Sequence, residues 1–410
     1  MSKKDKQHAL VPRLRFPEFR DESGWSPVRL EDLAERVTTR NTDGGVTRVL
    51  TNSAEHGVLN QREYFDKDIA TKGNLDGYYV VENGDFVYNP RVSAAAPVGP
   101  ISRNNVDQGV MSPLYTVFRF NHTNTEFYKH YFKSTSWHSY LRSVSSTGAR
   151  HDRMSITNAD FMRMPVPNPH PDEQQKIADC LGSLDDLIAA EARKLAALRD
   201  HKKGLMQQLF PREGETRPRQ RFPEFRDAGE WDSKTLEDVC DLKAGDFVRA
   251  AEIAEQRGAG MFPCYGGNGL RGYVTTFTHS GPLVLIGRQG ALCGNVNLFD
   301  GMFHATEHAL VATPKPKVDV DWLYYALTDL NLNRFAIGQA QPGLSVSVLN
   351  SVGVLVPEDE DEQQRIADCL SALDALIAAQ AERLDALLTH KRGLMQQLFP
   401  APETSKEAGG

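Results

Sequence analysis

The chain has 410 residues, of which 40% are hydrophobic and 25% are charged, with a formal net charge of −7 at pH 7. This length predicts two domains with connecting segments, each large enough to bury its own core. No apolar run approaches the roughly 18 residues of a membrane span, and the acidic total excludes a protein coated in basic surface, although a local basic patch suffices to contact phosphates.

The first 14 residues predict a disordered arm. The segment MSKKDKQHALVPR is basic, but it lacks the apolar core and the small-residue cleavage site of a secretory signal. No CxxC pair occurs among the five cysteines. Reduced thiols and a cytoplasmic location are therefore expected.

Residues 15–171 are predicted to form the first β-rich domain. It opens with the segment RFPEFRD, residues 15–21. Alternating apolar runs predict short strands, and an aromatic-rich stretch predicts a helix. The strands are expected at residues 77–81, 85–88 and 115–120, and the helix at residues 126–142.

A polar loop at residues 142–155, RSVSSTGARHDRMS, combines basic side chains with small residues and a glycine. Such a loop can approach phosphates closely and reach base edges. An ordinary solvated loop is the alternative. The candidate DNA contacts of this domain are Arg91, Arg103, Arg142, Arg150, His151 and Arg153.

Residues 172–211 predict a long helix that recurs, after the polar linker 212–220 and a second domain, at residues 361–400. The two copies are identical at 29 of 40 positions. Their apolar residues recur at heptad spacing, which is typical of a coiled coil. The predicted interhelix positions are Ile177, Leu181, Leu184, Ile188, Leu195 and Leu198, with Ile366, Leu370, Leu373, Ile377, Leu384 and Leu387 in the second copy. Polar residues interrupt both copies at matching places, which could fix the register.

Residues 221–360 predict a second β-rich domain that opens with another RFPEFRD segment, at residues 221–227. Strands are expected at residues 283–286 and 309–312, and a helix at residues 321–328. Arginine, asparagine and glutamine on glycine-flanked loops suit base-edge recognition, because their side chains bond guanine and adenine in bidentate fashion. The candidates are Arg271, Arg288, Gln289, Asn295, Asn297, Gln339 and Gln341.

One repeated frame with two unlike inserts predicts two different readers on a common scaffold. The fold class expected is α+β, with two β-rich domains separated by two long antiparallel coiled-coil helices and related by a pseudo-two-fold repeat. The alternative is that each helix packs only on its own domain. The pseudo-symmetry also predicts that Phe16 and Phe19 lie near Phe399, because the second RFPEFRD segment directly follows the end of the first helix. Residues 401–410 predict a disordered tail.

Three motifs are present but lack their structural context. Residues 267–272 fit GxGxxG, yet they lead into a strand-like segment instead of a helix. His304, Glu307 and His308 fit HxxEH, but the flanks predict turn and strand. The segment Asn89-Pro90-Arg91 lacks the second proline and the aromatic residue of an amino-methyltransferase motif, and no glycine-rich cofactor loop accompanies it.

The chain resembles the specificity (S) subunit of type I restriction–modification enzymes over about residues 15–400. The carrying motifs are EQQKIADCL with HKKGLMQQLFP and their second copies, EQQRIADCL with HKRGLMQQLFP. The segments before each helix, residues 164–167 and 354–357, match the closing strands of that family. YGGNGLRGY and LIGRQGALCGNVN look like parts of its target-recognition domains.

This resemblance implies a DNA-reading subunit without a catalytic centre. Each domain would read one half of a split sequence in double-stranded DNA, and the helices would dock methyltransferase (M) subunits. S-adenosylmethionine, ATP and magnesium would belong to the M and restriction (R) subunits, with no metal or cofactor in this chain. Adding about four residues to one helix would move a reader by roughly 6 Å and lengthen the tolerated gap.

Two other functions stay open. The chain could supply specificity to another restriction system with separately encoded specificity. It could instead be a stand-alone zinc hydrolase that uses the HxxEH segment, in which case the purified chain would contain stoichiometric zinc.

Overall fold

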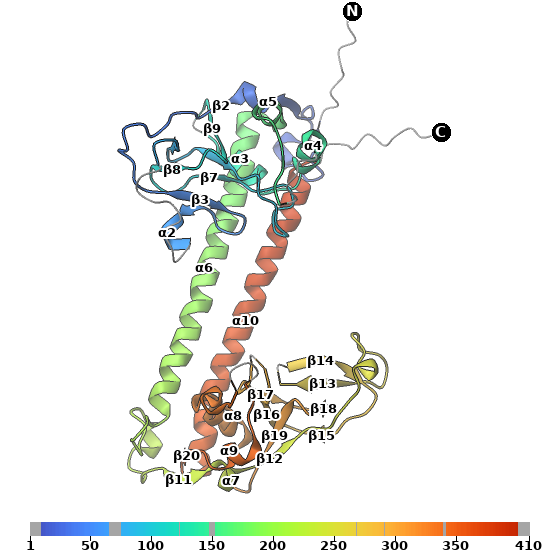
Figure 1. Ribbon diagram of the computed structural model, residues 1–410. Coiled ribbons are helices and arrows are strands. Elements are labelled where there is room, and N and C mark those ends of the chain that lie inside the picture. Colours follow the sequence, from blue (N-terminus) through green and yellow to red (C-terminus); the bar gives the residue numbers. More distant parts are fainter. Residues whose placement is uncertain are drawn as a thin grey trace, which may run out of the picture. The chain divides into compact units, whose positions relative to one another are not determined.

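The computed structural model describes residues 10–64, 75–122, 124–146, 152–267, 269–290, 292–338 and 342–400. The chain divides into two compact units. Unit 1 comprises residues 1–190 and 384–410, and unit 2 comprises residues 191–383. Each unit therefore holds one β-rich domain and one half of each long helix (Figure 1).

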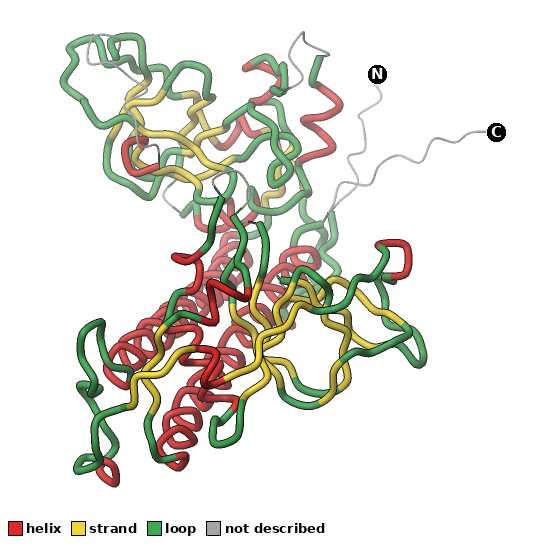
Figure 2. Tube along the Cα trace, turned by 60° about the horizontal axis from the view of Figure 1, so that its bottom comes forward, coloured by secondary structure: helices red, strands yellow, loops and turns green. Residues whose placement is uncertain are grey.

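Unit 1 is built on a four-stranded sheet of order β2-β9-β6-β7, with three two-stranded ladders, β1-β10, β3-β4 and β5-β8. Figure 2 shows the strands in yellow and the helices in red. Its strands are β1 Ser26–Arg29, β2 Ala34–Arg36, β3 Leu50–Ser53, β4 Gly57–Asn60, β5 Tyr79–Val81, β6 Phe86–Tyr88, β7 Ile101–Arg103, β8 Gly109–Met111, β9 Thr116–Phe120 and β10 Pro165–Asn168. Its short helices are η1 Pro17–Phe19, α1 Leu30–Leu33, α2 Gln61–Tyr64, α3 Glu126–Tyr131, α4 His138–Val144 and α5 Asn158–Met162.

Unit 2 contains two four-stranded sheets, of order β12-β19-β16-β17 and β14-β13-β18-β15, and the ladder β11-β20. Its strands are β11 Asp232–Thr235, β12 Cys240–Ala244, β13 Phe262–Gly266, β14 Gly269–Val274, β15 His279–Ser280, β16 Leu283–Gly287, β17 Val296–Phe299, β18 Met302–Ala305, β19 Ala309–Pro314 and β20 Gly353–Val356. Its helices are η2 Pro223–Phe225, α7 Leu236–Val239, η3 Ala250–Glu252, α8 Val320–Asp329, η4 Leu332–Phe335 and α9 Val346–Asn350.

The predicted strands at residues 115–120, 283–286 and 309–312 and the predicted helix at residues 321–328 are present as β9, β16, β19 and α8. The turn before β6 also forms, with Gly84 at φ 94°. The strands on either side of it do not pair with each other, because β5 pairs with β8 and β6 pairs with β7 and β9. The single helix predicted at residues 126–142 is wrong, because the chain forms α3 and α4 with a break between them.

The two long helices are α6 Pro171–Leu209 and α10 Glu360–Leu398. Their halves pair antiparallel within each unit, because partner residue numbers rise along one helix as they fall along the other. In unit 2, Lys202 Nζ lies 2.6 Å from Asp374 Oδ1, and Gln380 contacts Glu191. In unit 1, the same ion pair recurs between Lys391 and Asp185. The alternative in which each helix packs only on its own domain is therefore wrong, and the α+β class with antiparallel helices is confirmed.

The predicted interhelix residues are all buried or half-buried. Ile177 and Leu181 also belong to the core of the first domain, and Ile366 and Leu370 belong to the core of the second. Each helix therefore begins inside a domain core before it reaches the seam of the pair. Among the described residues, no helix is both long and apolar enough to cross a membrane.

The polar interruption at the middle of the seam is a direct contact between equivalent residues. Glu191 and Gln380 occupy the same place in the two copies, since 191 plus the repeat offset 189 is 380. They are 8% and 6% exposed. Gln380 Nε2 donates to Glu191 Oε2 at 2.6 Å and to the Glu191 carbonyl at 3.1 Å. A buried bond of this kind favours one register, because a shifted helix would leave both groups without a partner.

The start of the first domain lies on the end of α10. The Leu14 amide donates to the Gln397 carbonyl at 3.1 Å, and the equivalent Gln220 amide donates to the Gln208 carbonyl at 3.0 Å in unit 2. Phe16 and Phe19 lie in unit 1 with Phe399, and Phe16 packs against the same core as Phe399, so the predicted closure is confirmed. Leu10 pairs with Trp25, so the disordered arm predicted for residues 1–14 is wrong at residues 10–14. Residues 1–9 and 401–410 lie outside the described part.

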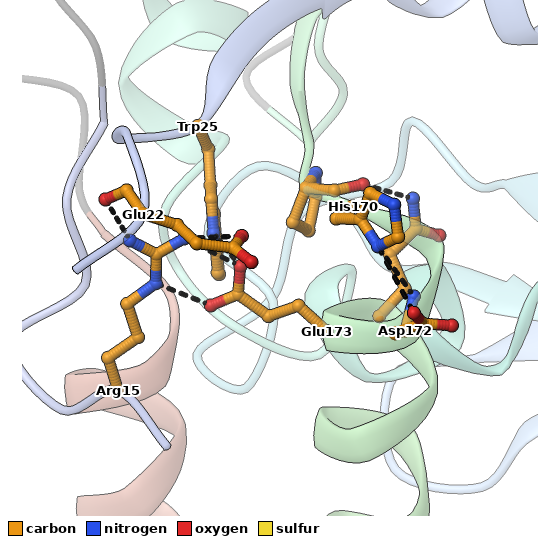
Figure 3. A network of polar contacts seen from close by, with 8 residues as sticks. Arg15, Glu22, Trp25, His170, Asp172 and Glu173 are labelled. Carbon is orange, nitrogen blue, oxygen red and sulfur yellow. Dashed lines mark hydrogen bonds and ion pairs between the residues drawn. The ribbon is translucent and has the colours of Figure 1, made fainter. Parts of the chain in front are cut away.

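A buried ion pair joins each RFPEFRD segment to the first turn of a long helix (Figure 3). Arg15 Nε and Nη2 donate to the Glu173 carboxylate at 2.7 and 2.8 Å, and Trp25 Nε1 donates to Glu173 Oε2 at 2.9 Å. In unit 2, Arg221 Nε and Nη2 donate to the Glu362 carboxylate, both at 2.6 Å. These pairs explain why the arginine of the segment and the glutamate of the helix recur together.

The repeat extends into the domains, where the sequence did not reveal it. Helices α3 and α8 match at an offset of 195 residues, so that Phe127 is equivalent to Trp322 and His130 is equivalent to Tyr325. Trp25 meets Phe127 edge-on, just as Trp231 meets Trp322. Both helices also touch the interhelix ion pair of their unit. Tyr325 donates to Asp374 at 2.7 Å, and His130 Nδ1 lies 3.8 Å from Asp185.

His130 is expected to make the stability of the protein pH-dependent. Its ring is fully buried, and burial lowers its pKa from 6.5 to about 4, although the Asp185 carboxylate acts in the opposite direction. The neutral folded ring does not bind the proton that the unfolded ring takes up below pH 6.5. Stability is therefore complete above pH 6.5 and falls by about 1–3 kcal/mol toward pH 4.

Urea unfolding between pH 7 and pH 4 measures this dependence. The His130→Gln variant should lose stability over that range by a smaller amount than the natural chain. The same pH slope in both proteins would contradict the assignment to His130.

Candidate nucleic-acid interface

Two predicted arginines of unit 1 lie side by side although they are 62 residues apart (153 − 91). Arg91 and Arg153 form an antiparallel β-bridge, which is flanked by the bonds Val92 N to Asp152 O and Met154 N to Pro90 O. Side chains of a bridged pair stand on the same face. Arg91 is exposed, and the Arg153 side chain is 24% exposed. The bridge therefore places the two arginines on one face, where Arg153 Nε also lies 3.7 Å from Asp152 Oδ2.

The Asn89 side chain connects this bridge to the rest of the domain through two hydrogen bonds. Its Oδ1 accepts from the Arg91 amide at 3.0 Å, and its Nδ2 donates to the Asn52 carbonyl at 2.9 Å. Both polar atoms of the Asn89 side chain are thus used within the protein. The Asn-Pro-Arg segment therefore shapes a loop that displays Arg91.

The other predicted residues of unit 1 differ in availability. Arg142 is exposed on α4. Arg103 is on β7 and forms an ion pair with Glu126, which also accepts from Lys129 at 2.8 Å. The Arg103 guanidinium is therefore partly neutralised in the free protein. Arg150 and His151 lie outside the described residues.

In unit 2, four loop segments meet around Arg288. The Arg288 amide donates to the His308 carbonyl at 2.9 Å, and the Arg288 carbonyl accepts from the Leu344 amide at 2.9 Å. These two bonds join the loop after β16 to the β18–β19 turn and to the segment before α9. The β13–β14 turn lies at the same place, because Gly267 packs against His308 of the β18–β19 turn and against Gly287 and Arg288 at the end of β16. Residues distant in sequence thereby form one surface.

Glycine is required where these loops cross. A Cβ at Gly267 would lie 2.7 Å from the His308 carbonyl oxygen and 2.9 Å from the Gly287 Cα. A Cβ at Gly287 would lie 2.6 Å from the Leu292 carbonyl oxygen. Backbone atoms cannot yield as a flexible side chain can, so any larger residue would push the loops apart. The GxGxxG segment leads into strand β14 instead of a helix, as its flanks predicted, and Gly267 packs where the loops cross.

The predicted residues of unit 2 are placed around this crossing. Arg271 is exposed on β14, and Gln289 and Asn295 are exposed on the loop between β16 and β17. Arg288 is half-buried, with Nη1 donating to the Glu307 carbonyl at 3.4 Å, and Asn297 is half-buried on β17. Gln339 and Gln341 lie outside the described residues.

The sequence did not single out Ile337, although it is 69% exposed and pairs with Gly343, which pairs in turn with Gln289. A usable signal was the pair Gly338 and Gly343, which brackets a loop between η4 and α9. An apolar residue at the start of such a loop has no helical or strand periodicity that would bury it.

The HxxEH residues do not form a metal centre. His304 lies on β18, where its Nε2 is 3.2 Å from the Asp246 carbonyl oxygen, and Glu307 and His308 contact each other at 3.3 Å in the turn that follows. Within the described ranges, no group of three or more histidine, cysteine, aspartate or glutamate residues is placed to hold a metal ion. The strand and turn predicted from the flanks are confirmed.

Comparison with known proteins gives one consistent result. The family model described as type I restriction modification DNA specificity domain matches residues 22–200 and 228–389. The EcoprrI type I restriction enzyme specificity subunit of Escherichia coli is 45% identical over 144 residues, which are 35% of this chain and 36% of that protein. The match thus spans about a third of that relative's length.

Two solved structures share the fold. The type I restriction–modification S subunit from M. genitalium has a TM-score of 0.62 at 15% identity, covering 95% of this chain and 99% of that one. A chain from a structure titled for complex assembly and conformational transition of the type I R-M system has a TM-score of 0.54 at 20% identity, covering 96% and 100%. At these identities the likeness concerns the fold.

Proposed function

The chain belongs to the type I restriction modification DNA specificity domain family, and from this membership we propose that it recognises a bipartite, asymmetric sequence in double-stranded DNA. Each β-rich domain reads one half of the site, and the bases between the halves are not read. The observation that carries this proposal is one repeated frame holding two unlike loop surfaces, Arg91–Arg153 in unit 1 and the Arg288 crossing in unit 2.

Both surfaces offer the chemistry that DNA contacts need. Arginines bind phosphates or the guanine edge, and a glutamine amide matches the adenine edge. Backbone hydrogen bonds and close packing fix the loops that carry these side chains, so little backbone freedom is lost on binding. A net charge of −7 does not exclude DNA binding, because contact depends on the local basic groups.

The long helices supply a surface for methyltransferase (M) subunits in this proposal. Leu187 and Leu376 occupy the same position of the repeat, since 187 plus 189 is 376, and they are 39% and 55% exposed. Equivalent exposed leucines on equivalent helix faces suit two copies of one partner. Restriction (R) subunits would join through the M subunits.

The chain itself carries no catalytic step in this proposal. S-adenosylmethionine, ATP and magnesium act in the M and R subunits, and the assembly works in the cytoplasm, where the DNA is. Specificity for another restriction system is not favoured, because every relative described above is a type I protein.

Selection of bound fragments from a random DNA library tests the proposal, with the full chain and its co-purified subunits as the binding species. Two separated blocks of conserved bases are expected. Arg288→Ala should relax selection in one block only, and Arg91→Ala or Arg153→Ala should leave that block unchanged. A single contiguous block, or no selection at all, would contradict the proposal.

The Arg91–Arg153 pair is also expected to contribute to the salt dependence of binding. Each Arg→Ala substitution at these positions should weaken binding and reduce the slope of log K against log salt concentration by about 1, if the residue contacts a phosphate. Arg29→Ala is the matched control, because Arg29 is exposed but lies 3.1 Å from Glu31 on β1 and α1. Equal slopes for all of these variants and the natural chain would rule out the phosphate contacts.

A further inference from the structure

Three backbone segments of unit 2 meet at Gly343. Gly343 forms an antiparallel bridge with Ile337 on one side and with Gln289 on the other. The Ile337 and Gly343 backbones exchange both hydrogen bonds at 2.9 Å. On the other side, the Gly290 amide donates to the Pro342 carbonyl at 3.0 Å, and the Leu344 amide donates to the Arg288 carbonyl at 2.9 Å. The centre of this small three-stranded ribbon is therefore fixed by backbone bonds.

The side chains of Gln289 and Ile337 stand on the same face of this ribbon. Bridged residues project to one side, and neighbouring strands lie about 4.8 Å apart, so the two side chains are separated by about 10 Å. Gly343 lies between them without a side chain. Gly343 thus adds no side chain between the Gln289 amide and the Ile337 aliphatic group, and we call this arrangement of three residues the notch.

The backbone does not require glycine at position 343. Its φ is outside the left-handed region, and a Cβ would lie 3.7 Å from its nearest neighbour, the Arg288 carbonyl oxygen. That distance is ordinary van der Waals contact. Gly343 thus differs from Gly267 and Gly287, where a Cβ would strike backbone, and its effect is to keep the notch open.

Ile337 forms the aliphatic wall, and its side chain stays exposed because two hydrogen bonds to Gly343 fix its backbone. Ile337 is 69% exposed, whereas Leu344, one residue beyond the notch, is 3% exposed. Single exposed apolar residues are common on protein surfaces. Ile337 is distinguished by its fixed backbone, by the amide opposite, and by the Arg288 crossing beside it.

We propose that the notch formed by Gln289, Gly343 and Ile337 reads an A·T base pair in the major groove. This inference rests on the proposed DNA-recognition function. Adenine presents its N7 acceptor and N6 amino donor in the major groove, which a glutamine amide bonds in bidentate fashion. Thymine presents its C5 methyl group, which an aliphatic side chain contacts. One wall of the notch fits each base of the pair.

Base analogues test the two walls separately, with the full chain and its co-purified subunits binding the selected sequence. Replacing thymine by deoxyuridine removes only the methyl group, and replacing adenine by 7-deazaadenine removes only the N7 acceptor. At one A·T pair in the half read by unit 2, each analogue should weaken binding about 5-fold or more. Ile337→Ala should bind thymine and uracil DNA equally, and Gln289→Ala should lose the response to 7-deazaadenine.

Gly343→Val provides a variant that fills the notch and whose Cβ makes only ordinary van der Waals contact, 3.7 Å from the Arg288 carbonyl oxygen. It should unfold at the same temperature as the natural chain and should lose preference for the A·T pair. Phe277→Ala is the control, because Phe277 is also exposed in unit 2, at 45%, but contacts Phe262. It should leave both analogue responses intact.

The outcomes distinguish failure of the A·T reading from failure of the proposed DNA-recognition function. A natural chain that selects no sequence would overturn the proposed function. A chain that selects two half-sites but responds to neither analogue, or whose Ile337→Ala variant still distinguishes thymine from uracil, would overturn the A·T reading alone. Loss of co-purified subunits in Ile337→Ala, with unchanged analogue responses, would assign the notch to a protein partner and would also overturn it.

Discussion

Replacing Gln380 by glutamate is expected to destabilise the helix pair by about 3 kcal/mol. Gln380 and Glu191 are buried at the middle of the seam, and the substitution exchanges a hydrogen-bond donor for a second carboxylate at 2.6 Å. Arg383 lies 2.8 Å from Glu191 but is 59% exposed, so solvent screens its compensation. Urea unfolding at pH 7 measures the loss.

Two controls show whether the repulsion causes this loss. The reversed pair, Glu191→Gln with Gln380→Glu, should recover most of the stability, because it restores one donor and one acceptor at equivalent positions. The loss in the single variant should also shrink as the pH falls, because protonation of one carboxyl removes the repulsion. Equal losses in the single and the reversed double variant would contradict a specific contact at this position.

Replacing Glu173 by alanine is expected to cost more than any other single truncation among the ion pairs described here, about 3–5 kcal/mol. The Arg15 side chain is 8% exposed and the Glu173 side chain 1% exposed, so the arginine would stay buried with the half-exposed Glu22 carboxylate, 3.9 Å away, as its remaining counter-charge. Trp25 Nε1 would also lose its hydrogen bond to Glu173 Oε2. Urea unfolding followed by tryptophan fluorescence measures this effect.

The equivalent substitution Glu362→Ala is the matched comparison. It strands Arg221 in the same way, but Trp231 Nε1 is buried and has no hydrogen-bond partner among the described residues, so no indole bond is lost. The loss should therefore be smaller than for Glu173→Ala by about 1 kcal/mol. Equal losses in the two variants would show that the Trp25 bond contributes nothing.

The arrangement of the two long helices and the segments before the domains was predictable because each of these segments occurs twice in the sequence. The helix repeat and the RFPEFRD repeat predicted the antiparallel pairing. The matching polar interruptions suggested a fixed register, but the partners in the pairs Lys202–Asp374 and Lys391–Asp185 were found only in the structure. Heptad spacing indicates which residues face the partner helix, and this does not depend on the sequences of the two domains. The predicted helix ends were accurate to one or two residues for the same reason.

The domains were less predictable because long-range pairing decides their structure. The pairing of β5 with β8 instead of β6 depends on contacts that no local pattern records. The match between α3 and α8 was hidden because packing equivalence does not need identity: Phe127 and Trp322 fill the same place, as do His130 and Tyr325. The candidate nucleic-acid interface was also only partly predictable from the sequence. Loop residues such as Arg288 were found by type, but the bridge that joins Gln289 to Ile337 through Gly343 depends on the fold.

The most direct test of DNA reading by two unlike domains is methylation-sensitive sequencing of DNA from cells that carry the complete system. The account predicts one asymmetric motif made of two different blocks of bases, with a gap of fixed length and no preferred bases inside it. In cells carrying Gly343→Val, only one of the two blocks should change. A palindromic or contiguous motif, or a single substitution that alters both blocks, would contradict the account.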